Sequence, residues 1–261
     1  MSEPRERAPP LIGLLGAVQF LTRVPVRTRD EVPWRRVVGW LPLVGLAIGA
    51  VVGGVYAAMR ELTEAPLLSA AVAVAVGMMI TGAFHEDGLA DVADAIAGGS
   101  TPAARLRILD DPRHGTYGVA ALAASIVLRV TALGALGNAT GAVAATLAHG
   151  LGRGGAVAVM GLAPARATGL AAAAHTDTTG RARTAGIAVT IAVAALVSGW
   201  WVAVAVAASI CSTALVTVMC RRAFGGINGD VLGAVEQVGE VTTLIVVVTL
   251  TAHHSLPSVL L

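Results

Sequence analysis

The chain has 261 residues, of which 56% are hydrophobic and only 13% are charged, whereas about 25% of the residues in a typical soluble domain are charged. The net charge of +2, without a basic stripe of interleaved aromatic residues, argues against nucleic-acid binding. Cys211 and Cys220 lie in an apolar segment without CxxC spacing, which argues against a disulfide framework or a zinc site. We therefore expect a single all-α integral membrane domain, residues 1–261, built as a polytopic helical bundle.

Six apolar segments are long enough to cross a hydrocarbon core of about 30 Å, which needs roughly twenty helical residues. They lie at 41–59, 65–84, 117–137, 139–163, 185–219 and 241–256. The fifth is too long for one span and carries SGWW (198–201) near its middle, so we predict two short spans joined by a tight turn there. The expected count is about seven transmembrane helices, within a range of about six to eight. The stretch 11–21 is too short to cross and predicts an interfacial or re-entrant helix.

Arginine is distributed unevenly among the segments that connect these spans. The N-terminal segment 1–40, the loops 85–116 and 164–184, and the pair at 221–222 are rich in arginine, whereas the intervening loops contribute only Arg60. With seven spans, all the arginine-rich segments fall on one side, which the positive-inside rule makes the cytoplasmic side. We expect the N-terminus and these loops to face the cytoplasm.

The apolar segment that ends near residue 84 runs directly into FHEDGLADVADAIAGG (84–99). Asp87, Asp91 and Asp94 are spaced by four and three residues, so an α-helix places them on one face. Carboxylates this close repel one another unless a cation lies among them, and hard oxygen ligands suit Mg²⁺ or Mn²⁺. The spacing predicts a divalent-metal site on a helix that ends at Gly98–Gly99. The alternative is a solvated acidic face just outside the membrane.

The following stretch, RLRILDDPRHGTYG (105–118), alternates arginines and aspartates and then turns. Guanidinium groups match the geometry of phosphate oxygens, so the arginines are candidate phosphate ligands. The alternative is a salt-bridged surface loop. The candidate phosphate-binding set of this loop is Arg105, Arg107, Asp111, Arg113 and Gly115.

Three polar residues within or beside the apolar segments also need an explanation. Arg129 and Arg153 lie inside predicted spans, where a charge is costly unless it is paired or hydrated. Substrate binding is therefore the first hypothesis for both, and pairing with an intramembrane carboxylate is the alternative. His85 is suited to act as a base or to bind phosphate, or it is simply hydrogen-bonded.

A glycine-rich stretch, FGGINGDVLGAVEQVGE (224–240), precedes the last apolar segment. A glycine turn ahead of a helix can present backbone N–H groups to an anion, although no P-loop pattern is present. Its alternative is a plain turn between spans. The candidate substrate-binding residues here are Gly226, Gly229, Asp230 and Glu240.

These motifs, in this order, resemble the cobalamin synthase family, the adenosylcobinamide-GDP ribazoletransferases. The matching stretches are FHEDGLADVADA, DDPRHGTYG, LGRGGAVAV with APARATGL, and GGINGDVLGAVEQVGE. The similarity covers most of the chain, from FLTRVPV (20–26) to residue 240, while the closing apolar segment matches only in hydrophobicity.

The resemblance implies a membrane enzyme that transfers the adenosylcobinamide phosphate unit of adenosylcobinamide-GDP to α-ribazole or its 5′-phosphate. We expect it in the bacterial cytoplasmic membrane, with its active site facing the cytoplasm. GMP leaves, and the product is adenosylcobalamin or its 5′-phosphate. The family requires Mg²⁺, and its carboxylate motif maps onto Asp87, Asp91 and Asp94, with Glu86 as a candidate fourth ligand. We expect Asp91, Asp94 or His85 to accept the proton of the attacking hydroxyl, and the residues do not choose among them.

The expected partners are these two substrates and the lipid bilayer, with a homo-oligomer or an association with other corrinoid-pathway enzymes left open. The nearest rival is a CDP-alcohol-type phosphotransferase, but Val92 stands where that pattern has an arginine. A transporter lined by Arg129 and Arg153 is a further alternative. Its binding site would lie at the bilayer midplane, whereas the charged motifs gather on one side. A structural membrane subunit would not need the aspartates.

Overall fold

The computed structural model describes residues 11–26, 28 and 32–253 of the chain. Helices make up nearly all the regular structure of these residues, and one isolated β-bridge pairs Pro164 with Ile227. Two short 3-10 segments, η1 (Val38–Trp40) and η2 (Gly199–Trp201), interrupt the α-helices. The α-helices are α1 (Ile12–Leu21), α2 (Trp34–Val37), α3 (Leu41–Thr63), α4 (Pro66–Thr81), α5 (Phe84–Gly98), α6 (Pro102–Ile108), α7 (Thr116–Gly134), α8 (Asn138–Val159), α9 (Leu170–Asp177), α10 (Gly180–Ser198), α11 (Val202–Phe224) and α12 (Gly229–His253).

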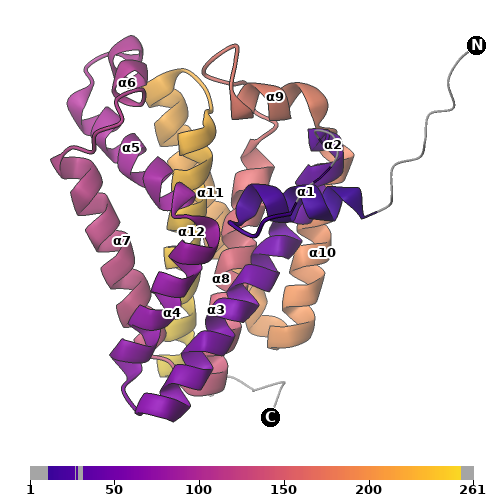
Figure 1. Cartoon of the computed structure of the whole chain (residues 1–261), viewed down its shortest axis with the longest axis vertical. Coiled ribbons are helices and arrows are strands. Elements are labelled where there is room, and N and C mark those ends of the chain that lie inside the picture. Colours follow the sequence, from indigo (N-terminus) through magenta and orange to yellow (C-terminus); the bar gives the residue numbers. More distant parts are fainter. Residues whose placement is uncertain (1–10, 27, 29–31, 254–261) are drawn as a thin grey trace, which may run out of the picture.

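Seven long helices, α3, α4, α7, α8, α10, α11 and α12, run along the bundle in alternating directions (Figure 1). Short turns join α3 to α4, α7 to α8 and α10 to α11 at one end, while α6 and α9 cap the other. The end with α6 and α9 carries the arginines of the connecting loops, and we call it the arginine end. Of the described arginines only Arg60 lies at the opposite end. The predicted partition of arginine between the two ends is therefore confirmed.

The length and apolar composition of the helices identify the membrane spans. Among the described residues, Trp34–Thr63, Thr116–Gly134, Val202–Phe224 and Gly229–His253 are each long and apolar enough to cross, and the bent pair of α4 and α5 makes a fifth. The seven predicted spans each correspond to one long helix, but α8 and α10 are not among these candidates. In α8, Arg153 lowers the mean hydropathy. The all-α polytopic fold is confirmed, with four or five spans by composition alone.

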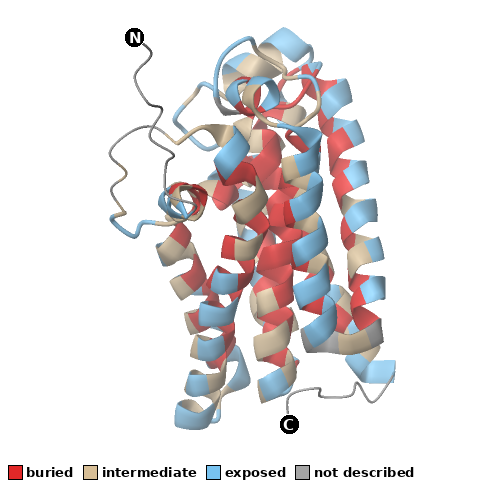
Figure 2. Ribbon diagram, turned by 90° about the vertical axis from the view of Figure 1, so that its right-hand side faces the viewer, coloured by how far each residue is buried: buried red, intermediate tan, exposed pale blue. Residues whose placement is uncertain are grey.

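The outward faces of the long helices are apolar as well as exposed. Figure 2 shows buried residues on the inner faces of the bundle and exposed residues on its outer faces. The outer faces carry Met79, Leu215 and Ile210, which are 75%, 69% and 62% exposed. A water-soluble bundle does not present such a surface over several helices, whereas a lipid-facing bundle does.

Helices α3 and α8 pack most closely, and glycine makes this possible. A Cβ atom on Gly49 would lie 2.5 Å from the carbonyl oxygen of Ala145, and one on Gly53 would lie 2.4 Å from that of Ala142. Small residues four apart let two helix backbones approach in this way inside a membrane. α8, which carries His149 and Arg153, is thereby held in the centre of the bundle.

The predicted span 65–84 is shorter in the structure, because α4 ends at Thr81. Gly82 and Ala83 both adopt left-handed backbone conformations, with φ of 70° and 57°, and α5 leaves at 92° to α4. The bend carries α5 toward the arginine end. α5 ends at Gly98 with Gly99 as its C-cap, as predicted.

The start predicted for the last span, 241–256, is too late in the chain. α12 starts at Gly229, so Glu236 and Glu240, which are 0% and 2% exposed, lie within the helix and not before it. Carboxylates depress the hydropathy of this stretch, although the helix continues through it. The turn predicted at 198–201 is present as η2, and α1 lies crosswise to the long helices (Figure 1).

Candidate active site

The carboxylates of α5 meet a histidine that approaches from another element. Asp87 Oδ1 lies 3.4 Å from His114 Nε2, and Asp91 Oδ1 lies 3.4 Å from His114 Nδ1. His114 belongs to the loop between α6 and α7 at the arginine end. The three side chains are 61%, 17% and 35% exposed in the order Asp87, Asp91, His114, so the group opens to solvent.

Asp94 fixes the loop that carries His114. Its carboxylate accepts hydrogen bonds from the backbone amides of Gly115, at 2.6 Å, and Gly118, at 2.9 Å. These amides belong to the first turn of α7, where unpaired N–H groups and the helix dipole favour a negative charge. Asp94 thus caps the start of α7, and its oxygens are not among the donor atoms that lie together in the open group.

The start of α12 lies against the middle of α5. A Cβ atom on Gly88 would lie 2.8 Å from the carbonyl oxygen of Asp230, so only glycine permits this approach. The charges of Asp87, Asp230, Asp94 and His114 all act on Asp91. Four carboxylates therefore gather near one imidazole, and this concentration of negative charge favours a bound cation.

The donor atoms of Asp87, Asp91 and His114 lie within 4.8 Å of one another, close enough to bind one ion. Carboxylate oxygens suit Mg²⁺ and Mn²⁺, and of these residues Asp87 and Asp91 supply them. The residues present therefore fit a divalent cation held by the two aspartates, with His114 beside it.

Glu86 and His85, which precede these aspartates on α5, point into the bundle. This differs from the expectation that Glu86 is a metal ligand and that His85 acts as a base or binds phosphate. Glu86 is 3% exposed and binds Arg129 inside the bundle, with Oε1 2.9 Å from Nη1. His85 is 5% exposed and has Nδ1 3.7 Å from Glu236. The structure therefore does not place Glu86 with the candidate metal ligands, nor His85 with the groups that solvent reaches. Successive side chains of an α-helix point in directions about 100° apart around its axis, so Glu86 and His85 lie on a different face from Asp87 and Asp91.

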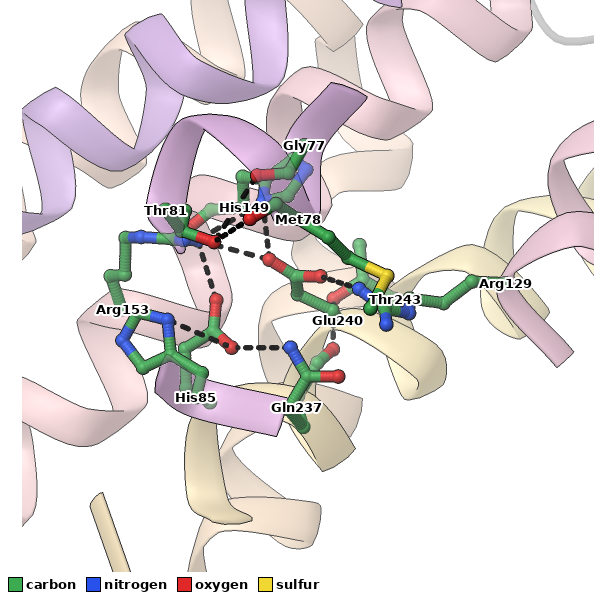
Figure 3. Close-up of polar contacts among 12 residues, drawn as sticks. Gly77, Met78, Thr81, His85, Arg129, His149, Arg153, Gln237, Glu240 and Thr243 are labelled. Atoms are coloured by element: carbon green, nitrogen blue, oxygen red, sulfur yellow. Dashed lines mark hydrogen bonds and ion pairs between the residues drawn. The ribbon is translucent and has the colours of Figure 1, made fainter. Parts of the chain in front are cut away.

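Arg153 lies at the centre of a buried polar network between α8 and α12 (Figure 3). Its Nη1 is 2.5 Å from Glu236, 2.9 Å from Glu240 and 3.0 Å from Nδ1 of His149. His149 also contacts Glu240. His149, Glu236 and Glu240 have the composition of a metal site, but a guanidinium nitrogen already lies among all three. Arg153 supplies the positive charge there, so this group does not need a metal.

Arg129 extends the network to α5 and α7. Its Nη1 lies 2.9 Å from Glu86 and 3.4 Å from Glu240, and it is 4% exposed. Gln237 continues the network by donating to Glu236 and accepting from Ser125, both at 3.0 Å. Both intramembrane arginines are thus paired with glutamates, which is the alternative that the sequence left open for them. Charged groups also lie inside the bundle and not only at one end, contrary to the expectation from the motifs.

The arginines of the acidic loop adopt different positions. Arg105 donates to the carbonyl oxygen of Ala223 at 3.1 Å and so ties α6 to the end of α11. Arg107 and Arg113 are exposed. Arg113 forms two hydrogen bonds with Asp111, and these hold the pKa of that carboxyl at about 2. Arg107 and Arg113 therefore face solvent, where a phosphate can reach them.

The glycine-rich loop pairs with the loop after α8. Ala165 N donates to the carbonyl of Ile227 at 2.8 Å, and Ile227 N donates to that of Ala163 at 3.0 Å. Gly226 is required here, because its Cβ would lie 2.5 Å from Ala165 N. Between the two loops is a cavity of about 200 Å³, lined by Arg166, Gly229 and Asp230 among others. A cationic side chain and the start of α12 thus face the same small space.

Comparison with known proteins places the chain in a family. The family model for cobalamin-5-phosphate synthase matches residues 13–248. The chain belongs to this family.

Curated relatives of this cobalamin-5-phosphate synthase family member are named adenosylcobinamide-GDP ribazoletransferase. The protein of Bradyrhizobium diazoefficiens is 39% identical over 237 residues, covering 88% of this chain and 90% of its own. That of Rhizobium johnstonii is 35% identical over 252 residues, covering 89% and 95%, and that of Azorhizobium caulinodans is 34% identical over 252 residues, covering 91% and 96%. No solved structure shows a significant match.

Four residues of the site in this synthase family member have no role that the sequence alone assigns. His114 lies in the quoted stretch DDPRHGTYG, and a histidine beside an arginine-aspartate turn was the available signal. Arg166 lies in APARATGL, a stretch that resembles the family but whose pattern indicates no role for this arginine. Glu236 and Gln237 lie in the predicted glycine-rich segment, but no local pattern indicates that α12 buries them against α8.

Proposed function

We propose that the chain is an adenosylcobinamide-GDP ribazoletransferase that works at the arginine end of the bundle. It joins the adenosylcobinamide phosphate unit to α-ribazole or its 5′-phosphate and releases GMP. The observation that carries the proposal is the open group of Asp87, Asp91 and His114, held on an apolar bundle in a member of this family. The curated relatives carry the same activity in their names.

Asp87 and Asp91 would hold Mg²⁺, for which Mn²⁺ can substitute. Their oxygens are within reach of a single ion, and the neighbouring Asp230 adds negative charge. A bound divalent ion supplies charge neutralisation for the diphosphate of the donor as the leaving group develops negative charge. Arg107 and Arg113 are exposed at the same end of the bundle and can contact phosphate oxygens.

His114 is the residue best placed to accept the proton of the attacking hydroxyl. It is 35% exposed beside both aspartates, whereas Asp94 accepts two backbone hydrogen bonds and His85 is buried. A ribose oxygen of the acceptor forms a bond to the phosphorus attached to cobinamide. The bond from that phosphorus to the GMP oxygen breaks, and GMP leaves with the electron pair.

The arginine end would face the cytoplasm. The loops at this end hold most of the described arginines, and the positive-inside rule places such loops there. In that orientation a water-soluble nucleotide donor reaches the aspartates directly, while the bilayer surface lies beside them.

The test uses the full chain in lipid nanodiscs with adenosylcobinamide-GDP, α-ribazole and Mg²⁺. We expect GMP and adenosylcobalamin in equal amounts, and Asp91→Asn should lower the rate by at least about 100-fold, since a charged ligand is lost. Mn²⁺ binding, measured by electron paramagnetic resonance without substrates, should weaken in the same variant. Asp177→Asn on α9, where the carboxylate pairs with Arg35, is the matched control and should leave both unchanged.

Three outcomes would overturn parts of the proposal. CMP release from a CDP-linked alcohol without GMP release would favour the CDP-alcohol class. Uptake of adenosylcobinamide-GDP into proteoliposomes without GMP release would favour a transporter. Full activity of Asp91→Asn would reject the metal assignment.

A further inference from the structure

A groove runs along the outside of the bundle between α8, α10 and α11. It encloses about 380 Å³ and is lined mainly by apolar and small residues, among them Gly154 and Gly155 of α8. Four hydroxyl residues also line it: Thr190, Ser209, Thr213 and Thr217. Ile210 and Val218 of α11 line it and are 62% and 48% exposed, so it opens sideways from the bundle. In a membrane protein such an opening faces lipid.

One wall of the groove carries an unpaired hydroxyl. Thr217 is 7% exposed, and its Oγ1 has no hydrogen-bond partner within the described part of the chain. Other buried threonines donate to the carbonyl four residues earlier, as Thr190 does to Gly186 at 2.9 Å and Thr243 to Gly239 at 2.8 Å. The Thr217 hydroxyl has no such bond and lies in the wall of the groove without a partner among the described residues. Leaving a buried donor unpaired is unfavourable, so a ligand that accepts from it is stabilised.

Cationic side chains stand one helix turn beyond this hydroxyl. Arg221 follows Thr217 by four residues and Arg222 follows Val218 by four, so each lies above a groove residue on α11. Both arginines are exposed at the arginine end, and no ion pair joins them to a described carboxylate. The groove is therefore mostly apolar along its length, has the unpaired Thr217 hydroxyl near one end, and has positive charge just beyond.

We propose that this groove binds one anionic glycerophospholipid of the surrounding membrane. The acyl chain fills the apolar length, an ester carbonyl accepts a hydrogen bond from Thr217, and the phosphate and headgroup lie against Arg221 and Arg222. One helix turn, about 5.4 Å, separates Thr217 from Arg221 along α11. This distance suits the short glycerol link between an ester and a phosphate. A soluble phosphate would use the arginines but not the groove, so the lipid alone accounts for all three features.

The test is native mass spectrometry of the purified full chain with palmitoyl-oleoyl phosphatidylglycerol or palmitoyl-oleoyl phosphatidylcholine. We expect one tightly bound phosphatidylglycerol, with an affinity about 10-fold above that for phosphatidylcholine. Thr217→Val removes the hydroxyl while keeping the shape of the side chain, and should lower the affinity for phosphatidylglycerol about 3- to 10-fold. Arg221→Gln should abolish the preference between the two lipids, and Ala214→Phe should block binding by filling the groove.

Two controls keep these results interpretable. Thr251→Val, on the exposed end of α12, and Arg36→Gln, on α2, should leave lipid binding unchanged. All variants should keep the wild-type rate of GMP release, which shows that they are folded. Equal binding of the two lipids, unchanged binding by both Thr217→Val and Ala214→Phe, or a lipid-free dimer that Ala214→Phe dissociates would each overturn the proposal.

Discussion

The Asp94 carboxylate accepts a 2.6 Å hydrogen bond from the backbone amide of Gly115. Gly115 follows His114, so this single contact holds the imidazole over the neighbouring face of α5. A second hydrogen bond, from Gly118, aligns the first turn of α7 with the same carboxylate. The spacing that suggested a three-aspartate metal site thus serves two purposes, because Asp94 positions the loop while Asp87 and Asp91 stay open.

Replacing Asp94 by asparagine should separate these purposes. The amide keeps one acceptor oxygen but loses the charge, and hydrogen bonds to a charged group contribute about 1.5–3 kcal/mol. We expect the rate of GMP release to fall about 10- to 100-fold as the His114 loop loosens, with Mn²⁺ binding retained. Loss of Mn²⁺ binding equal to that of Asp91→Asn would instead make Asp94 a metal ligand. Asp177→Asn on α9, whose carboxylate pairs with Arg35, is the control.

His114→Ala should remove the general base without removing the metal ligands. General-base catalysis contributes typically about 10²–10⁴-fold, so we expect GMP release to fall by that factor while the KM for adenosylcobinamide-GDP changes little. Imidazole added to the buffer should restore part of the rate, because a free base can enter the cavity left behind. His175→Ala on α9 should behave as wild type. A large rise in KM without rescue by imidazole would assign His114 to substrate binding.

The bundle itself was largely predictable from the sequence. Apolar segments of membrane length located all seven long helices, and tryptophans at an apparent midpoint located the turn at η2. The start of α12 was missed because hydropathy treats Glu236 and Glu240 as a boundary. Their charges are neutralised by arginines on other helices, a relationship that only the folded chain establishes.

The site was predictable only in part, because contacts between different helices place some of its residues. Helical spacing correctly put Asp87 and Asp91 together, but it could not show that Glu86 turns inward to Arg129. Nor could it bring His114, more than twenty residues away, to the same face. That placement depends on the cap that Asp94 forms with α7, which is a tertiary contact.

Arg153→Met should test the buried network. Removing one partner of a buried ion pair leaves uncompensated charge and costs about 3–5 kcal/mol, and here two glutamates lose the same guanidinium. We expect a large fall in the midpoint of thermal unfolding in detergent. Adding Glu240→Gln should recover part of it, since one of the unpaired charges is removed. Arg107→Met, at an exposed site, should not shift the midpoint, and an unshifted midpoint for Arg153→Met would show that the pairing contributes no stability.

Gly226→Ala should show whether the glycine-rich loop must pair with the loop after α8. An added Cβ would lie 2.5 Å from Ala165 N and 2.6 Å from the Pro164 carbonyl carbon, so backbone must move and the bridge to Ile227 must open. This displaces the cavity that Arg166 shares with Asp230. We expect the KM for adenosylcobinamide-GDP to rise about 10-fold, given that overpacking costs typically about 1–3 kcal/mol. Gly54→Ala, where a Cβ meets nothing within 4 Å, is the matched control and should leave KM unchanged. Equal KM values for the two variants would mean that the paired loops do not shape the donor site.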